Sequence, residues 1–405
     1  MEIVRLGTLT DRNIGYGIVQ PGDSIPNGIP VIKVNNIISG LRNVHDLETT
    51  SIENDKKYSR TKLLGGELII SVVGTIGKTA IVPKDFAGCN LVRATALIDI
   101  PNPQMTKWVK YYIDSPNGQH YIRENLNTTV QPTLNIKSLV EMPIPIYSSD
   151  YIRTATCFLS YLDDKIEVNR RINDNLEQQA QALFKSWFVD FEPFKDGEFV
   201  ESELGMIPKG WRVGTLSEVA IINPARTLKK GKVAIYLDMK NMPTAGSFPS
   251  TWEKKEYAGG MKFQNHDTIM ARITPCLENG KVAYVNFLQN EEVAFGSTEY
   301  IVMTTNDDFM PELLYYLCRD ESFKSYATKN MNGSSGRQRV SGETIGKYKI
   351  AIPPKSLLEP IAPYFKSIMD ITKKNGMEII SLSSLRDTLL PRLMSGELKI
   401  NDISV

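Results

Sequence analysis

An internal duplication constrains the fold of this chain more than any other feature of its sequence. Short matches recur about half a chain length apart, at offsets of 204 to 207 residues: Arg5–Leu9 with Arg212–Leu216, Tyr111–Ile113 with Tyr315–Leu317, Ile144–Ile146 with Ile350–Ile352, and Leu176 with Leu382. Any one match could arise by chance, but a nearly constant offset within 405 residues indicates a repeat. We therefore interpret the chain as two copies of one structural unit.

Each copy begins with a stretch rich in β-branched residues, glycine and proline. Short alternating runs such as residues 67–73 and 282–285 predict strands joined by turns, and a helix is expected near 104–124 and again near 309–329. Prolines then precede a long helical tract in each copy. We predict four segments: α/β domains over 1–148 and 201–355, and helical regions over 149–200 and 356–405.

Two long helices are expected, from about Asp150 to Phe191 and from about Ser356 to Ser395. Their apolar residues recur in alternating steps of three and four, the heptad pattern of a helix that packs on another helix. At 1.5 Å per residue, about 40 residues form a rod roughly 60 Å long. The predicted seam contains Leu162, Ile166, Asn169, Asn173, Leu176 and Leu183 in the first helix, and Ile368, Asn375, Ile379 and Leu382 in the second.

Polar residues interrupt both seams at matching places, Asn169 and Asn173 in the first helix and Asn375 in the second. In an antiparallel pair these layers meet, and a buried asparagine contact fixes the register at some cost in stability. We predict an α+β fold in which two pseudo-symmetric α/β domains are separated by two long helices, packed as an antiparallel coiled coil. The alternative is that each helix packs only on its own domain.

A second apolar stripe runs beside the end of each seam. One partner helix does not easily cover both stripes, so the additional surface belongs either to an interface or to the underside of the adjacent globular domain. Together with the neighbouring seam positions, the residues are Phe184, Trp187 and Phe188 in the first helix, and Leu389, Leu390, Leu393 and Met394 in the second.

Composition restricts the classes of function. The chain has 47 Lys and Arg against 46 Asp and Glu, so nucleic-acid binding would depend on local basic surfaces. The first residues, MEIVRLGTLTDRN, contain no apolar signal region, and no apolar run approaches the roughly 18–20 residues of a membrane span. We therefore expect a cytoplasmic protein. Three histidines and four scattered cysteines lack metal-ligand spacing, so no metal site is expected.

The motifs of an enzyme are missing. No G-x-G-x-x-G loop is present for a dinucleotide or a methyl donor, and no Asp/Asn-Pro-Pro-aromatic motif of an adenine methyltransferase. Residues 73–79 (VGTIGKT) end like a phosphate-binding loop, but Val72 stands where that loop needs glycine, and the second copy keeps only Gly280-Lys281. A hairpin turn that carries a lysine explains both copies. We expect neither catalysis nor a cofactor in this chain.

Binding residues are more plausible than catalytic ones. The loop Gly333–Arg339 (GSSGRQR) carries donors that suit phosphates and base edges, since arginine can bind guanine and glutamine can bind adenine through two hydrogen bonds. The first copy has the less basic Asn127–Thr133 in the corresponding place. A shared frame with different tips is expected if each copy reads a different short sequence. The alternative for any single residue is a solvated turn with ordinary surface charge.

The candidate DNA-binding residues are chosen by chemistry and position. Lys78 and Lys281 are the candidates for phosphate contacts. The candidates for reading or positioning are Gln131, Thr133, Arg272, Arg337, Gln338 and Arg339, with Lys33, Asn35 and Ser335 as further DNA-binding candidates.

Three tracts of the chain resemble the specificity subunit of bacterial type I restriction–modification enzymes. They are residues 182–191 (ALFKSWFVDF), 204–211 (LGMIPKGW) and 385–397 (LRDTLLPRLMSGE). The resemblance covers essentially the whole length, because that family alternates two variable target-recognition domains with two related helical regions. It identifies 1–148 and 201–355 as the recognition domains.

The resemblance implies a function. Such a subunit has no catalytic centre and binds a split, asymmetric DNA target; each recognition domain reads one half, and the helices span the unread spacer. Two modification subunits, which carry S-adenosylmethionine and methylate adenine, dock on it, and restriction subunits that use ATP and Mg can join. This favours partner contact for the two apolar stripes. The alternatives are a nucleotide-binding enzyme that uses Gly74–Thr79, and a helical scaffold that bridges two partners without reading DNA.

Overall fold

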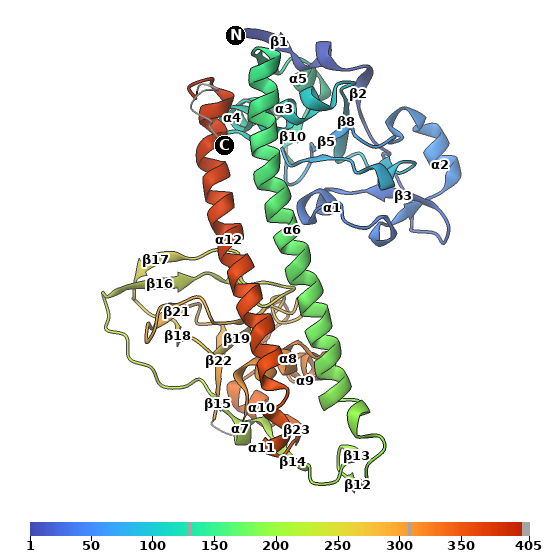
Figure 1. Cartoon of the computed structure of the whole chain (residues 1–405). Coiled ribbons are helices and arrows are strands. Elements are labelled where there is room, and N and C mark those ends of the chain that lie inside the picture. The colour runs from blue at the N-terminus through green and yellow to red at the C-terminus, as the bar shows by residue number, and fades with distance from the viewer. Residues whose placement is uncertain (128–130, 307–308, 399–405) are drawn as a thin grey trace. The chain divides into compact units, whose positions relative to one another are not determined.

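The computed structural model describes residues 1–127, 131–306 and 309–398 (Figure 1). The chain divides into two compact units. Unit 1 comprises Met1–Asp163 and Ser384–Val405, and unit 2 comprises Asp164–Ser383. Both boundaries fall inside long helices, so each unit contains a part of both helices. Within the described ranges, every helix is too short or too polar to cross a membrane.

Unit 1 contains a four-stranded and a three-stranded sheet. The larger has the order β2-β8-β5-β6 and the smaller the order β4-β3-β7, while β1 pairs with β11 and β9 with β10. The strands are β1 (Glu2–Arg5), β2 (Arg12–Tyr16), β3 (Ile29–Ile32), β4 (Thr49–Thr50), β5 (Leu68–Ser71), β6 (Thr79–Ile81), β7 (Asn90–Leu91), β8 (Thr95–Asp99), β9 (Leu126–Asn127), β10 (Thr133–Leu134) and β11 (Pro143–Ile146). The helices are α1 (Val34–Ser39), α2 (Ile52–Lys57), α3 (Pro103–Asp114), α4 (Pro116–Glu124) and α5 (Ile136–Val140).

Unit 2 repeats this arrangement. Its sheets have the orders β15-β22-β19-β20 and β17-β16-β21-β18, β14 pairs with β23, and a separate hairpin joins β12 to β13. The strands are β12 (Phe199–Ser202), β13 (Gly205–Pro208), β14 (Arg212–Thr215), β15 (Ala220–Ile222), β16 (Val233–Leu237), β17 (Glu253–Glu256), β18 (Met261–Phe263), β19 (Thr268–Ala271), β20 (Val282–Tyr284), β21 (Ala294–Gly296), β22 (Tyr300–Thr305) and β23 (Lys349–Ile352). The helices are α7 (Leu216–Val219), α8 (Pro311–Arg319), α9 (Glu321–Lys329), α10 (Gly342–Gly346) and α11 (Lys355–Leu358).

The duplication is confirmed, but one sequence match is out of register. Leu6 and Leu216 are both fully buried, and their backbone N–H groups donate to the carbonyls of Met142 and Tyr348 at 2.9 and 2.8 Å. Leu216 is therefore the structural equivalent of Leu6, whereas the match by letters pairs Leu6 with Val213. The match of identical residues is therefore shifted by three residues from the structural equivalence, which burial and strand pairing determine.

The helices predicted near 104–124 and 309–329 are each divided in two. Ser115 is extended and caps α4, accepting a hydrogen bond from the backbone of Gly118 at 3.3 Å, and Pro116 follows it. Asp320 has the same role before α9, accepting from Ser322 at 2.9 Å. A residue before proline avoids the helical region, and Ser and Asp favour the capping position, so both helical tracts break there.

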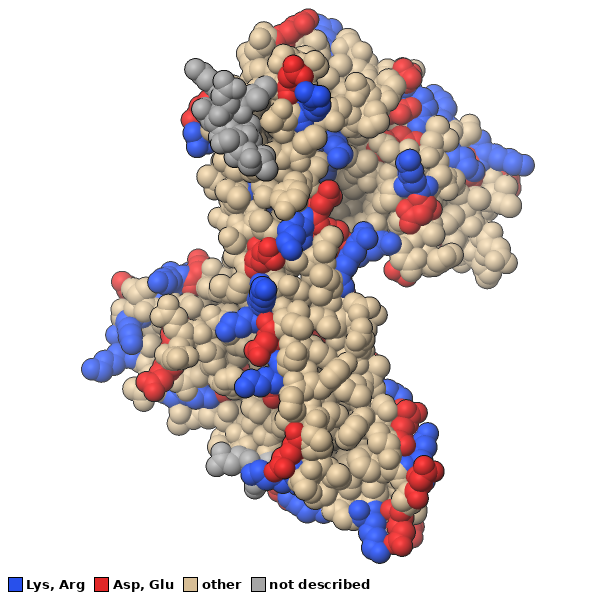
Figure 2. Space-filling model, in the orientation of Figure 1, with Lys and Arg blue, Asp and Glu red and all other residues tan. Residues whose placement is uncertain are grey.

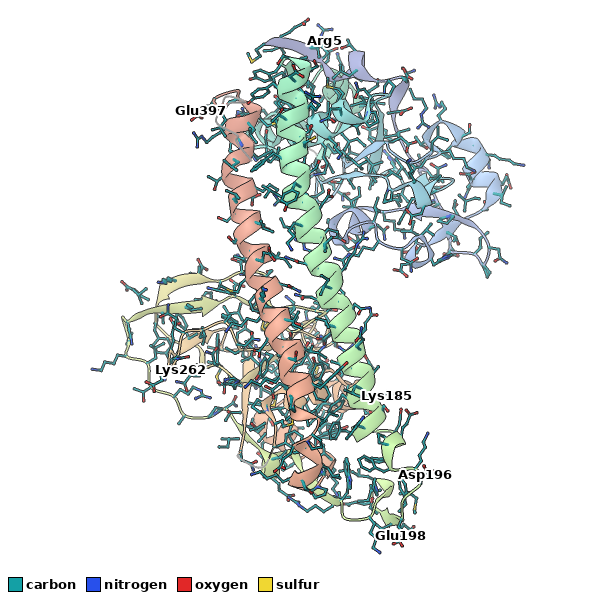
Figure 3. The ribbon with its side chains drawn as sticks, in the orientation of Figure 1. Arg5, Lys185, Asp196, Glu198, Lys262 and Glu397 are labelled. Atoms are coloured by element: carbon teal, nitrogen blue, oxygen red, sulfur yellow. The ribbon has the colours of Figure 1, made fainter. Side chains whose placement is uncertain are left out.

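Two long helices, α6 (Ser149–Phe188) and α12 (Ala362–Met394), differ in extent from the prediction. α6 ends three residues before Phe191, which adopts a left-handed backbone with φ of 55°. Lys185 lies near this end of α6 (Figure 3). Its ammonium is 2.6 Å from the carboxylate of Asp190, just beyond the helix. The second tract is broken between α11 and α12, where Pro360 cannot donate a helical hydrogen bond, and Pro363 lies in the first turn of α12, which tolerates proline.

Within each unit the two long helices pack antiparallel, as predicted. In unit 2, Asn169 donates to Glu378 at 2.8 Å, and Asn375 donates to Asn173 at 2.8 Å. In unit 1, Tyr151 donates to the carbonyl of Leu393 at 2.9 Å. The alternative, in which each helix packs only on its own domain, is wrong because these bonds join α6 to α12 directly.

The predicted seam residues differ in how deeply they are buried. The buried ones are Leu162, Ile166, Asn169, Ile368 and Asn375. Those that are partly exposed are Asn173, Leu176, Leu183, Ile379 and Leu382. The polar layer therefore occurs within the helix pair of unit 2, where a buried asparagine contact restricts the register.

Each unit has a core that includes both long helices. In unit 1, Leu159 of α6 and Leu393 of α12 belong to the cluster that contains Trp108, whose indole N–H donates to Pro145 at 2.8 Å. In unit 2, Phe184 of α6 and Phe365 of α12 belong to the corresponding cluster. The helices are thus integral parts of both cores.

Candidate nucleic-acid interface

A hairpin turn and a distant loop meet at one place in unit 1. The turn joins β5 to β6, and Ser71 donates its backbone N–H to Lys78 at 2.8 Å. A β-bridge joins Val73 to Thr133, and Leu134 donates to Val72 at 2.9 Å. Residues 128–130, which belong to the predicted polar tract, lie outside the described residues.

The same connections form in unit 2. In the hairpin from β19 to β20, Ala271 donates to Lys281 at 2.9 Å. A bridge joins Ile273 to Arg339, and Val340 donates to Arg272 at 3.0 Å. The prediction of a hairpin turn carrying a lysine is confirmed in both copies. We call this place the loop junction: residues 72–78, 92–94 and 131–134 in unit 1, and 272–281, 297–299 and 337–340 in unit 2.

The shared bonds align the two loop junctions residue by residue. Val72 donates to Ala94 at 2.8 Å, and Arg272 donates to Glu299 at 3.0 Å, so these pairs are equivalent. Three pairs of residues are equivalent in the two units because they form the same backbone bonds or bridge. The residue of unit 1 is neutral and that of unit 2 is charged in each pair: Val72 and Arg272, Ala94 and Glu299, Thr133 and Arg339. One frame therefore presents two different chemistries.

Glu299 binds Arg339 in unit 2. The Arg339 Nε lies 3.0 and 2.9 Å from the two Glu299 carboxylate oxygens, and its Nη2 lies 2.7 Å from Oε1. These hydrogen bonds lower the pKa of the Glu299 carboxyl and raise the pKa of Arg339. The Arg272 Nε lies 4.0 Å from Glu299 and has no hydrogen bond with the described residues.

The exposed tip of the unit 2 junction carries three further candidates. Ser335 and Arg337 are exposed, and a bridge from Asn332 to Arg339 closes their loop. Gln338 is partly exposed, and its carbonyl accepts a hydrogen bond from Thr274 at 3.0 Å. These three residues belong to the same loop as Arg339, and their role in DNA binding stays a prediction.

The two predicted phosphate-binding lysines are not alike. Lys78 is exposed and forms no ion pair with the described residues. Lys281 is partly buried, and its ammonium donates to the carbonyl of Met239 at 2.7 Å. A backbone carbonyl already binds the ammonium of Lys281, so Lys281 is less available than Lys78, and its contact with phosphate stays a prediction.

The unit 1 candidates fall into two groups. Gln131 is exposed and Thr133 is partly exposed, and both belong to the loop junction. Lys33 and Asn35 lie at the start of α1 instead, and Lys33 pairs with Glu48 at 2.5 Å. Among the described residues, no hydrogen bond joins the side chain of Lys33 or Asn35 to the junction. In Figure 2, basic and acidic side chains are interspersed over the visible face.

The predicted partner interface requires a correction. Four of its residues are buried within their own units: Phe184 (5% exposed), Leu390 (7%), Leu393 (1%) and Met394 (1%). Phe184 packs in the unit 2 core and the other three in the unit 1 core, so the stripes form the underside of the globular parts. Trp187, Phe188 and Leu389 are partly exposed, and their role as partner contacts stays a prediction.

Sequence reasoning missed Glu299. Glu299 lies 40 residues before Arg339, so no local pattern links it to the loop Gly333–Arg339. The backbone bond from Arg272 to Glu299 depends on the pairing of β19 with β22, which local patterns do not reveal. Among the described residues, no group of three histidine, cysteine or carboxylate side chains could hold a metal ion.

Comparisons with known proteins agree with this arrangement. The chain is 26% identical over 317 residues to the type I restriction enzyme MjaIX specificity subunit of Methanocaldococcus jannaschii, covering 74% of this chain and 70% of that protein. It is 26% identical over 329 residues to the HindI specificity subunit of Haemophilus influenzae, covering 66% and 71%. The fold is similar to the crystal structure of a type I restriction–modification S subunit from M. genitalium, with a TM-score of 0.53, 16% identity, and coverage of 97% and 95%.

The family match spans both copies of the repeat. The model of the type I restriction modification DNA specificity domain matches residues 14–178 and 208–379. Each match contains one loop junction and part of one long helix. The chain belongs to the family of type I restriction–modification DNA specificity domains.

Proposed function

We propose that this chain is the DNA specificity subunit of a type I restriction–modification complex and catalyses no reaction itself. The observation that carries the proposal is the pair of loop junctions, which share their backbone bonds but differ in charge at three equivalent positions. A constant backbone arrangement that carries variable side chains suits sequence recognition. The side chains read the base edges, and the backbone only positions these side chains. The family match favours this function over a scaffold that does not touch DNA.

Each unit reads one half of a bipartite, asymmetric target. Unit 2 offers arginines and a carboxylate at its junction, whereas unit 1 offers Thr133 and the neighbouring Gln131, so the two half-sites differ in sequence. Arginine suits guanine and glutamine suits adenine. The helices α6 and α12 set the unread spacer between the half-sites, and the asparagine layer supports this role because it restricts their register.

Two modification subunits dock on the chain, one on each unit. In support, each unit has an apolar hollow at the end of a long helix: about 260 Å³ beside Phe188 and Val189 in unit 2, and about 310 Å³ beside Met394 and Ser395 in unit 1. These residue pairs share the 206-residue offset of the helical repeat. Two equivalent hollows suit two copies of one partner.

The cofactors of the complex belong to those partners. We assign S-adenosylmethionine to the modification subunits, and ATP and Mg to restriction subunits that can join the complex. The assembled enzyme acts on DNA in the cytoplasm. This chain contributes recognition and positioning only.

DNase footprinting of the complex tests the proposal. With the modification subunits added, we expect two short protected tracts on either side of an unprotected gap. Arg337→Ala should weaken protection of one tract and leave the other unchanged. One continuous footprint, or DNA affinity that is unaffected by Arg337→Ala and by Gln131→Ala alike, would instead support the scaffold.

A further inference from the structure

Glu299 binds Arg339 at a place where the backbone of the loop junction forms without a charged pair. Unit 1 has Ala94 and Thr133 in the positions of Glu299 and Arg339, yet it forms the same backbone bonds and the same bridge. The bond from Leu134 to Val72 in unit 1 matches the bond from Val340 to Arg272 in unit 2, at 2.9 and 3.0 Å. The ion pair of Glu299 with Arg339 is therefore not a requirement of the fold.

The contacts of Arg339 leave a defined set of donors. A guanidinium carries five N–H groups. Glu299 takes Nε–H and one N–H of Nη2, and the carbonyl of Arg337 takes one N–H of Nη1 at 3.0 Å. Among the contacts with described residues, one N–H therefore remains on each terminal nitrogen. Both remaining donors lie in the guanidinium plane, and N–H donors on the two terminal nitrogens can bind the O6 and N7 acceptors of guanine.

The carboxylate fixes where that pair of donors points. Arg339 remains 39% exposed, so the remaining edge of its guanidinium is accessible. Two hydrogen bonds to Glu299 hold the guanidinium plane, and a side chain held by a second hydrogen-bonded residue discriminates better than a free one. The negative charge of Glu299 also opposes the approach of a phosphate, which reserves Arg339 for a base edge.

On the basis of the proposed function, we propose that Glu299 is a positioning residue that sets base specificity: it holds Arg339 so that its remaining donors read a guanine in the second half-site. Arg272, 4.0 Å from the same carboxylate, adds positive charge beside the site. Unit 1 has neutral residues at the equivalent positions, so we propose no such role in reading the first half-site.

Binding of the complex with modification subunits to a panel of DNA duplexes tests this proposal. The parent duplex carries the target found by mapping methylated adenines in the host, and each variant exchanges one base pair. For the wild type, replacing the guanine should weaken binding roughly 5- to 150-fold. In Glu299→Ala and Glu299→Gln that penalty should fall to within about twofold, while the penalties in the first half-site stay unchanged.

Glu203→Ala is the matched control, because Glu203 pairs with Lys349 outside the loop junction. It should keep every base penalty, and Arg339→Ala should lose the same single penalty as the Glu299 variants. Glu299 variants that retain the full guanine penalty overturn the proposal, as does a lowered thermal midpoint with uniform loss of binding, which indicates a structural role. If the wild type discriminates no base at all, the proposed function itself fails.

Discussion

Breaking the asparagine contact between the long helices should cost unit 2 a measurable amount of stability. Asn375 is 8% exposed and donates to Asn173 at 2.8 Å, while Asn173 donates to the carbonyl of Thr372 at 3.2 Å. Asn375→Ala leaves the Asn173 oxygen without this donor in a largely buried layer, so the free energy of unfolding should fall by about 1–3 kcal/mol. Asn173→Ala should cost a similar amount. Because both remove one shared bond, the double variant should cost less than the sum by about 0.5–1.5 kcal/mol.

Urea unfolding followed by tryptophan fluorescence measures this coupling. Three of the four tryptophans, Trp187, Trp211 and Trp252, lie in unit 2, so the signal reports mainly on the unit that contains the contact. Asn175→Ala on the exposed face of α6 is a suitable control and should change stability little. If the costs of the single variants simply add in the double variant, the two side chains do not interact and the prediction is wrong.

Three further predictions follow from the buried and exposed groups. Phe184→Ala should destabilise the isolated chain by about 3–5 kcal/mol in urea unfolding, whereas a residue that serves only for docking would leave the isolated chain unchanged. Burial raises the pKa of Glu177, so its carboxyl group binds a proton more tightly in the folded chain than in the unfolded chain. The free energy of unfolding should therefore decrease as pH rises through that raised pKa, and Glu177→Gln should flatten this dependence in urea unfolding measured over a series of pH values. Lys78→Ala should reduce the slope of log affinity for DNA against log salt concentration by about 1 without changing base preference, and Lys281→Ala, whose ammonium binds Met239, should leave the slope unchanged.

Features that depend on local periodicity could be predicted from the sequence. The heptad steps of α6 and α12 and their asparagine interruptions are properties of neighbouring turns, so the helix pair and the Asn173–Asn375 contact were accessible. The ends of the helices were harder to predict, because Phe191 and Pro360 interrupt the helical tracts through backbone conformation, which periodicity does not reveal. The repeat was found from letters, but only strand pairing placed Leu216 opposite Leu6.

The candidate site could be predicted only in part, for a related reason. The loop from Ser335 to Arg339 was evident from its composition, yet the partner of Arg339 lies on a loop that strand pairing brings close. Periodicity identified the apolar stripes but not what covers them, so Phe184 and Met394 were assigned to an interface when they belong to cores. Contacts between residues distant in sequence decide both points.

A swap of three residues in the unit 2 loop junction tests whether the junctions read the bases of the two half-sites. The variant Arg272→Val, Glu299→Ala, Arg339→Thr gives unit 2 the side chains that unit 1 has at these positions. Adenine methylation would be mapped across the host genome with the wild-type and the variant chain. We predict that the second half-site changes or loses base preference, while the first half-site and the spacer length are retained. An unchanged bipartite target, or loss of preference in both halves, would contradict it.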